Sequence, residues 1–131
     1  MNDTEPTNEQ KSKILTQILK EIKTEGNLKG IIFSFREGNI IAENLAEEFP
    51  QFNAEEYSSM SASVIESIIG LGKTIGEKTI NKTIAELENF TIILIECDEK
   101  TFISFILDEK SKPNSFFTKI EDYIKKFKLL Y

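Results

Sequence analysis

The sequence predicts one α+β domain whose elements follow the order helix, two strands, helix, three strands, helix. Three observations lead to this prediction. Apolar residues recur at helical spacing in three segments, a Glu-Gly-Asn turn divides two β-rich runs, and short turns join three further β-rich runs. With 131 residues the chain fits a single domain, which we expect at residues 8–131 behind a flexible N-terminus at residues 1–7.

The first helix is expected at residues 8–25. Thr7 and Gln10 have the spacing of a capping box, and Gly26 is expected to stop the helix. One face carries an apolar stripe of Ile14, Leu15, Ile18, Leu19 and Ile22. This stripe predicts an amphipathic helix that covers a core.

Two strands follow in the segment GIIFSFREGNIIAENL, residues 30–45. The turn Glu37-Gly38-Asn39 lies between them, and an acidic residue followed by glycine favours a tight reversal. We therefore expect an antiparallel hairpin.

A long central helix is expected next. Pro50 and Asn53 mark its start, with Asn53 as N-cap and Glu56 three residues later, and the helical pattern continues to about Glu77. The Gly-Lys-Thr sequence at residues 72–74 is typical of a phosphate-binding loop. That loop requires a glycine where Ser67 stands and a strand before it, so we do not predict a nucleotide site.

Three antiparallel strands and a last helix complete the chain. The strands are expected at Thr83 to Glu88, Thr91 to Cys97 and Thr101 to Leu107. Pro113 and Asn114 introduce the last helix, whose apolar stripe consists of Phe116, Phe117, Ile120, Ile124 and Phe127.

The central helix has two apolar stripes, although a helix on a sheet needs only one. The first consists of Tyr57, Met60, Val64, Ile68, Leu71 and Ile75, and we expect it to pack on the sheet. The second consists of Ser58, Ala62, Ile65, Ile69, Gly72 and Gly76, whose small side chains would let another helix approach closely. Either a partner helix or another helix of the same chain would cover this second stripe.

A substitution distinguishes these two possibilities. If a partner covers the second stripe, Ile65→Glu separates a dimer and leaves the fold intact. If the chain itself covers it, the same change unfolds the monomer, because a carboxylate is buried without a partner.

Composition argues against several functions. A net charge of -6 disfavours nucleic-acid binding. No stretch has the apolar length of a membrane span, so we expect no membrane insertion. Cys97 is the only cysteine, which excludes an internal disulfide, and MNDTEPTNEQ lacks the apolar core of a signal peptide, so we expect a cytoplasmic protein.

The sequence offers little for catalysis. It contains no histidine, so neither a Ser-His nor a Cys-His pair can form, and we expect no enzyme, no catalytic residue, no cofactor and no metal site. Glu96, Asp98 and Glu99 could hold a divalent cation, but a solvated turn is the simpler interpretation. Arg36, the sole arginine, could act as an arginine finger, but a solvated strand end is favoured.

The order and character of these segments resemble the roadblock / dynein light chain family of the longin-like superfamily, over roughly residues 8 to 128. The hairpin GIIFSFREGNIIAENL is similar to the family's first two strands. The segment AEEYSSMSASVIESIIGLGKTIGE is similar to its central helix, and TIAELENFTIILIECDEKTFISFILDE to its last three strands. The chain departs from the family at residues 112–116, where Lys-Pro-Asn-Ser-Phe replaces Asn-Leu-Gly.

The resemblance implies a five-stranded antiparallel sheet with the long central helix on one face and the terminal helices on the other. It also implies a single-domain, prokaryotic-type member that forms a homodimer, or a heterodimer with a paralogue, by pairing central helices and third strands. The implied interface consists of Ser58, Ala62, Ile65, Ile69, Gly72, Gly76, Thr83, Ala85 and Leu87. The implied function is a scaffold or regulator that binds a Ras-like small GTPase.

A second resemblance is to profilin, an actin-monomer-binding protein. FPQFNAEE, at residues 49–56, and the terminal helix are similar to parts of profilin. Profilins have more strands after the central helix, and this alternative is kept beside the first.

Overall fold

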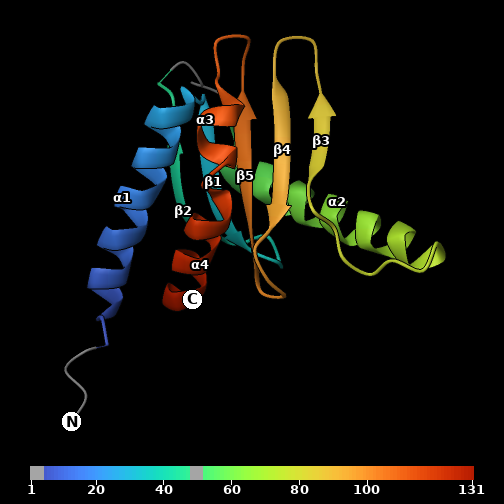
Figure 1. Cartoon of the computed structure of the whole chain (residues 1–131), viewed down its shortest axis with the longest axis horizontal. Helices are drawn as coiled ribbons and strands as arrows, with labels where there is room; N and C mark the ends of the chain where they lie inside the picture. Colours follow the sequence, from blue (N-terminus) through green and yellow to red (C-terminus); the bar gives the residue numbers. More distant parts are fainter. Residues whose placement is uncertain (1–4, 48–51) are drawn as a thin grey trace.

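A five-stranded antiparallel sheet forms the middle layer of the protein (Figure 1). The computed structural model describes residues 5–47 and 52–131. The strands are β1 (Gly30–Phe35), β2 (Ile40–Leu45), β3 (Thr83–Glu86), β4 (Thr91–Glu96) and β5 (Thr101–Leu107). Their order in the sheet is β2-β1-β5-β4-β3, so β2 and β3 are the edge strands. The predicted fold class is confirmed.

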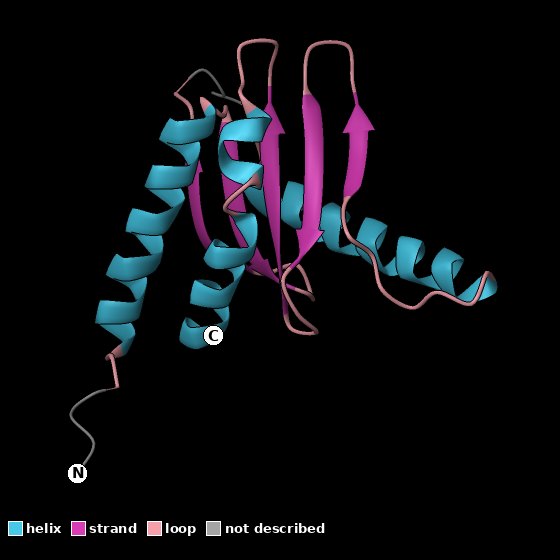
Figure 2. Ribbon diagram, viewed as in Figure 1, coloured by secondary structure: helices cyan, strands magenta, loops and turns pink. Residues whose placement is uncertain are grey.

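Helices cover both faces of this sheet (Figure 2). They are α1 (Asn8–Gly26), α2 (Ala54–Thr74), α3 (Pro113–Phe117) and α4 (Ile120–Leu130). In the view of Figure 1, α1, α3 and α4 lie in front of the sheet and α2 lies behind it. The structure therefore has the three layers that the resemblance implied.

The predicted starts of the two long helices are confirmed by their caps. The Gln10 backbone N–H donates to Thr7 Oγ1 at 3.1 Å, and the Thr7 N–H donates to Gln10 Oε1 at 2.7 Å. The Glu56 N–H donates to Asn53 Oδ1 at 3.0 Å. Each bond satisfies a backbone donor that the first turn of a helix leaves free. Pro50, the other predicted start signal, lies outside the described residues, as do residues 1–4 of the predicted N-terminus.

Three predicted helix ends were wrong. The first helix ends at Gly26 itself, and the residue that caps it is Asn27, which adopts the left-handed conformation with φ 51°. The second ends at Thr74 rather than near Glu77. The last helix is broken into α3 and α4, and the break allows Phe116 to stack on Phe105 and Phe127 to stack on Phe33. Packing on two different strands takes precedence over helical continuity here.

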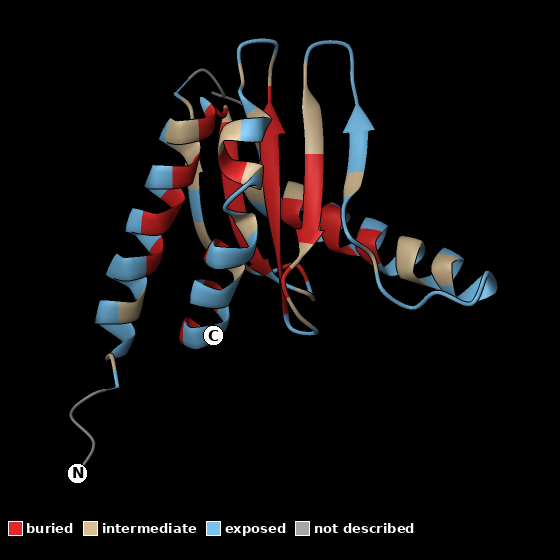
Figure 3. Ribbon diagram, in the orientation of Figure 1, coloured by how far each residue is buried: buried red, intermediate tan, exposed pale blue. Residues whose placement is uncertain are grey.

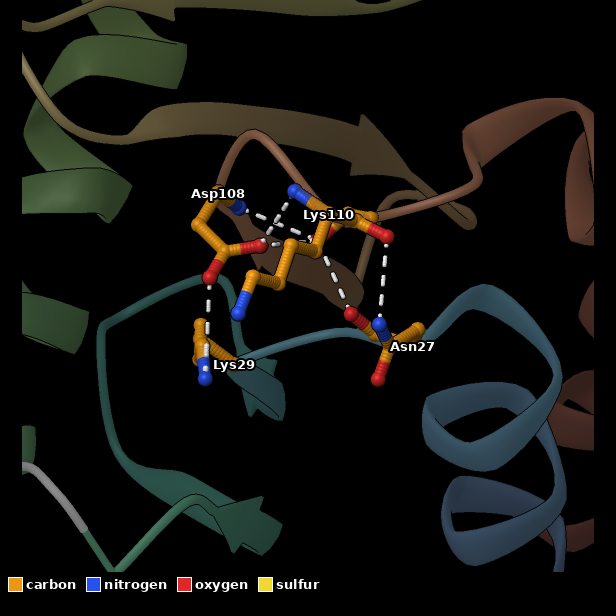
Figure 4. A network of polar contacts seen from close by, with 5 residues as sticks. Asn27, Lys29, Asp108 and Lys110 are labelled. Atoms are coloured by element: carbon orange, nitrogen blue, oxygen red, sulfur yellow. Dashed lines mark hydrogen bonds and ion pairs between the residues drawn. The ribbon is translucent and has the colours of Figure 1, made fainter.

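The loop before α3 is bonded to the C-terminal end of α1 (Figure 4). Ser111 Oγ donates to the Asn27 carbonyl at 2.9 Å, Asn27 Nδ2 donates to the Lys110 carbonyl at 3.1 Å, and Lys29 forms an ion pair with Asp108 at 3.5 Å. The Ser111 bond satisfies a carbonyl that the end of a helix leaves unpaired. The segment that departs from the family pattern continues this connection, since Ser115 Oγ donates to the Glu25 carbonyl at 2.8 Å.

Candidate interaction surface on the central helix and the edge strand

The stripe of small residues on α2 packs on the protein's own sheet. Ser58, Ala62 and Ile65 are buried, and Ile65 is 0 % exposed. Ala62 and Ile65 form a cluster with Leu94 of β4 and Phe102 of β5. The resemblance implied that these three residues belong to a dimer interface, and that was wrong. The sheet of the same chain covers them, rather than a partner helix or another helix of the chain.

The strands explain this orientation of α2. On the face toward α2, Ser34 Oγ shares a hydrogen bond of 2.6 Å with Ser58 Oγ, and Ser104 Oγ shares one of 2.5 Å with the Tyr57 hydroxyl. Burial raises the pKa of Tyr57 to about 12. Two strand serines thus supply hydrogen-bond partners for Ser58 and Tyr57, and leaving such hydroxyls unpaired beneath the helix would be costly.

The hairpin turn also contacts this side of α2. Gly38 has φ +107°, and a Cβ atom placed there would lie 2.8 Å from the Cα atom of Ser59. A side chain at position 38 would therefore push the turn away from the helix. The glycine that predicted the hairpin also allows α2 to lie close to it.

The stripe predicted to pack on the sheet is largely exposed instead. Leu71 and Ile75 are 63 % and 78 % exposed, and Met60 and Val64 are also exposed. We name Met60, Val64, Leu71 and Ile75 the outer stripe. Figure 3 shows that α2 is buried where it crosses the sheet, whereas its C-terminal part extends beyond β3 and is exposed or half-buried. Among the residues that the structure describes, no strand lies beneath this part of the helix.

A shallow apolar groove separates the outer stripe from the edge of the sheet. Its volume is about 240 Å³. The groove is lined by Tyr57, Met60, Ser61 and Val64 of α2 and by Thr83, Ala85, Ile92 and Leu94 of β3 and β4. Apolar side chains at such a groove mark a surface suited to association.

The edge strand β3 completes this surface. Of the predicted interface residues on the strand, Thr83 is half-buried, and Ala85 and Leu87 are exposed. Ile84, which was not predicted, is 50 % exposed. Strand β3 pairs with β4 on one side only, and its other side is the free edge of the sheet. The outer stripe and this edge therefore form one continuous candidate interface.

The rest of the predicted interface lies near the end of α2. Ile69 and Gly72 are half-buried, and Gly76 is exposed. Gly76 has φ +90°, and the Glu77 N–H donates to the Gly72 carbonyl at 2.9 Å, so these two glycines form the reversal that ends the helix. Within the monomer, Gly72 and Gly76 therefore serve to terminate α2. This role does not depend on a partner.

The glycines of α2 provide a stability test. We expect Gly76→Ala to lower the free energy of unfolding by about 1–2 kcal/mol, because a Cβ atom disfavours positive φ. We expect Gly70→Ala to raise it by up to about 1 kcal/mol, because alanine favours a helix interior. A Cβ atom at Gly70 would meet nothing within 4 Å. Urea denaturation measures the free energy of unfolding of both variants. If Gly76→Ala and Gly70→Ala changed it equally, Gly76 would not be the residue whose positive φ ends the helix.

Arg36 occupies a different environment from the one predicted. Its side chain is 12 % exposed and forms ion pairs with Glu66 of α2 at 2.7 Å and Glu96 of β4 at 3.0 Å. The prediction of a solvated strand end was wrong. The guanidinium connects the hairpin, α2 and β4, and its charge is already paired with two carboxylates.

The other residues considered for chemistry have structural roles. Asp98 Oδ1 accepts hydrogen bonds from the backbone N–H groups of Lys100 and Thr101, both at 2.8 Å. Partial burial raises the pKa of Asp98, but these hydrogen bonds to the carboxylate outweigh burial and hold the pKa below its usual value. Burial raises the pKa of the Cys97 thiol to about 12, so its thiolate is scarce at neutral pH.

The described residues show neither a metal-binding cluster nor a membrane-spanning helix. Residues 5–47 and 52–131 contain no group of three or more side chains arranged to hold a metal ion. Among the helices of the same residues, none has the length and apolar character needed to cross a membrane.

The sequence matches no family model and no curated protein, whereas the structure matches many solved structures. The gliding protein MglB from Thermus thermophilus superposes with a TM-score of 0.83 at 14 % identity, covering 99 % of this chain and 97 % of that chain. Myxococcus xanthus MglB gives a TM-score of 0.77 at 14 % identity, covering 87 % and 91 %. A roadblock/LC7 domain from Streptomyces avermitilis gives 0.73 at 8 % identity, covering 86 % and 93 %.

The profilin alternative receives less structural support. Acanthamoeba castellanii profilin IA superposes with a TM-score of 0.50 at 10 % identity, covering 83 % of this chain and 94 % of that chain. Part of the profilin-like segment, residues 49–51, lies outside the described residues. The arrangement of five strands, the long α2 and the terminal helices is that of the roadblock and MglB structures, and the protein has a roadblock-type fold.

Proposed function

We propose that this protein is a non-enzymatic roadblock-family scaffold that dimerises and binds a Ras-like small GTPase in the cytoplasm. The observation that carries the proposal is the outer stripe of α2 lying beside the free edge of β3. Leu71 and Ile75 extend beyond the sheet, where nothing in the described part of the chain covers them. The proposal assigns this surface to a second roadblock domain.

Dimerisation is supported by two features that would be costly in a monomer. Large apolar side chains gather on one side of α2, and exposed apolar surface of this kind favours association. An unpaired strand edge beside them invites a further strand. A second copy, or a paralogue with the same surface, would cover both. One similar structure is described as MglB with a tetrameric arrangement.

Binding of a small GTPase is the function that the family resemblance implies. The chain would contribute surface rather than a catalytic group, since Arg36 is held between Glu66 and Glu96 and Cys97 is buried. On this proposal the protein presents the GTPase to other factors or changes its nucleotide cycle by holding its switch segments.

The test is binding to a Ras-like small GTPase from the same genome, loaded with GDP or a GTP analogue. We expect a complex with one nucleotide state to be favoured in calorimetry, and Arg36→Ala to leave the hydrolysis rate of that GTPase unchanged if the folded fraction is preserved. No binding in either state would contradict the proposal. Binding of monomeric actin, measured in parallel, would instead support the profilin alternative.

A further inference from the structure

The two faces of β3 carry different side chains. Thr83 and Ala85 lie opposite Leu94 and Ile92 of β4, and all four line the groove beneath α2. Successive residues of a strand point to opposite faces, so Lys82, Ile84 and Glu86 lie on the other face. Consistently, Lys82 Nζ lies 4.8 Å from the centre of the Phe117 ring, on the side of the terminal helices.

The backbone groups of β3 also alternate in direction. The Leu87 N–H donates to the Phe90 carbonyl at 2.8 Å, so the backbone of Leu87 turns toward β4. By the alternation of an antiparallel ladder, Thr83 and Ala85 also turn toward β4, and Ile84 and Glu86 turn toward the free edge. The edge therefore offers hydrogen-bonding groups centred on Ile84.

In the proposed dimer, the resemblance implies that β3 pairs with β3 of a second copy. We infer the register of this pairing: the two strands run antiparallel, and Ile84 lies opposite Ile84 across the two-fold axis. This inference rests on the proposed dimer and specifies how it is built. In this register Lys82 lies opposite Glu86 of the second copy, and symmetry repeats the pair. Thr83 lies opposite Ala85, and these small side chains leave room below the two α2 helices.

The neighbouring registers bring unlike side chains together. Residues directly opposite in a sheet share a face, so the register can shift only in steps that preserve the faces. Centring on Ala85 places Ile84 opposite Glu86 and Lys82 opposite Glu88. Centring on Thr83 places Lys82 opposite Ile84. Only the register centred on Ile84 places Ile84 opposite Ile84 and places Lys82 opposite a residue of opposite charge, Glu86.

Charge reversal tests this register. Lys82→Glu or Glu86→Lys alone is expected to weaken the dimer, with Kd rising on the order of tenfold, because like charges then face each other twice. The double variant, with both changes, is expected to restore the wild-type Kd in analytical ultracentrifugation. Glu88→Lys is the matched control, and it should have little effect alone and should not rescue Lys82→Glu.

Disulfide formation provides a second, independent measurement. Opposite residues in adjacent strands lie about 4.5–5.5 Å apart, within the range of Cα separations that a disulfide bridges. We expect Ile84→Cys to form a covalent dimer on mild oxidation much faster than Ala85→Cys does. Cys97 is only 5 % exposed, so the wild-type chain serves as the control that should stay uncrosslinked.

The outcomes separate this inference from the proposed function. Rescue by the double variant together with crosslinking through Ile84→Cys supports the register. A stable dimer in which Ala85→Cys crosslinks, or in which Glu88→Lys rescues Lys82→Glu, overturns the register and leaves dimerisation standing. A wild-type chain that is monomeric at all accessible concentrations overturns both, and circular dichroism of each variant confirms that it is folded.

Discussion

Ile65→Glu is expected to unfold the monomer. Ile65 is fully buried between α2 and the sheet, against Leu94 and Phe102. An ionised carboxylate at this place would have no partner, and such changes lower the free energy of unfolding by about 3–5 kcal/mol. Since small domains are stable by only about 5–15 kcal/mol, this loss removes a large share of the folding free energy.

Urea denaturation followed by far-ultraviolet circular dichroism measures this effect. Leu129→Glu is the matched control, because it introduces the same side chain at an apolar position of α4 that is 85 % exposed and lies away from the proposed interface. The control should change the unfolding midpoint little. A folded Ile65→Glu protein with half the wild-type mass would contradict the structure, since it would mean that this residue faces a partner.

Leu71→Glu is expected to separate the assembly while the fold remains intact. Leu71 is 63 % exposed on the outer stripe and lies where α2 extends beyond the sheet. If a second copy covers this stripe, the carboxylate would be buried in the interface. Changes at the centre of an interface commonly cost 2 kcal/mol or more, so we expect Kd to rise by about 30-fold or more.

Light scattering on a sizing column, with circular dichroism on the same fractions, measures mass and folding together. The matched control is Leu129→Glu, because Leu129 is an exposed leucine on α4, away from the proposed interface, with 85 % exposure. Loss of mass in Leu71→Glu alone supports the proposed dimer. Equal masses for the wild type and both variants would argue against the outer stripe as the interface.

Local signals in the sequence were sufficient to predict the order of the helices and strands. The Thr7 and Gln10 capping box, the Asn53 cap and the Glu37-Gly38 turn act through residues close together in the chain, and each lies where it was predicted. Strand β3 was predicted two residues too long, because the alternation of Leu87 and Glu88 continues past the last paired residue. The ends of the helices depended on tertiary contacts, as the break between Phe117 and Ile120 shows.

The rotation of α2 about its axis could not be read from its own sequence. Both apolar stripes have the period of a helix, and the larger side chains of the outer stripe favoured the wrong one. The signals that decide it lie elsewhere in the chain. Ser34 and Ser104 bond to the hydroxyls of Ser58 and Tyr57 in the first turns of α2, and Arg36 pairs with Glu66.

Capping, turn formation and periodicity are properties of neighbouring residues, so the amino-acid sequence was enough to predict which segments become helices and strands. The family resemblance added α2 and β3 as the place of the proposed interface. Which residues of α2 and β3 remain exposed depended on tertiary packing. Burial depends on the polar and apolar groups of strands that are distant in the chain, and those strands bury Ser58, Ala62 and Ile65 and leave Met60, Leu71 and Ile75 available to a partner.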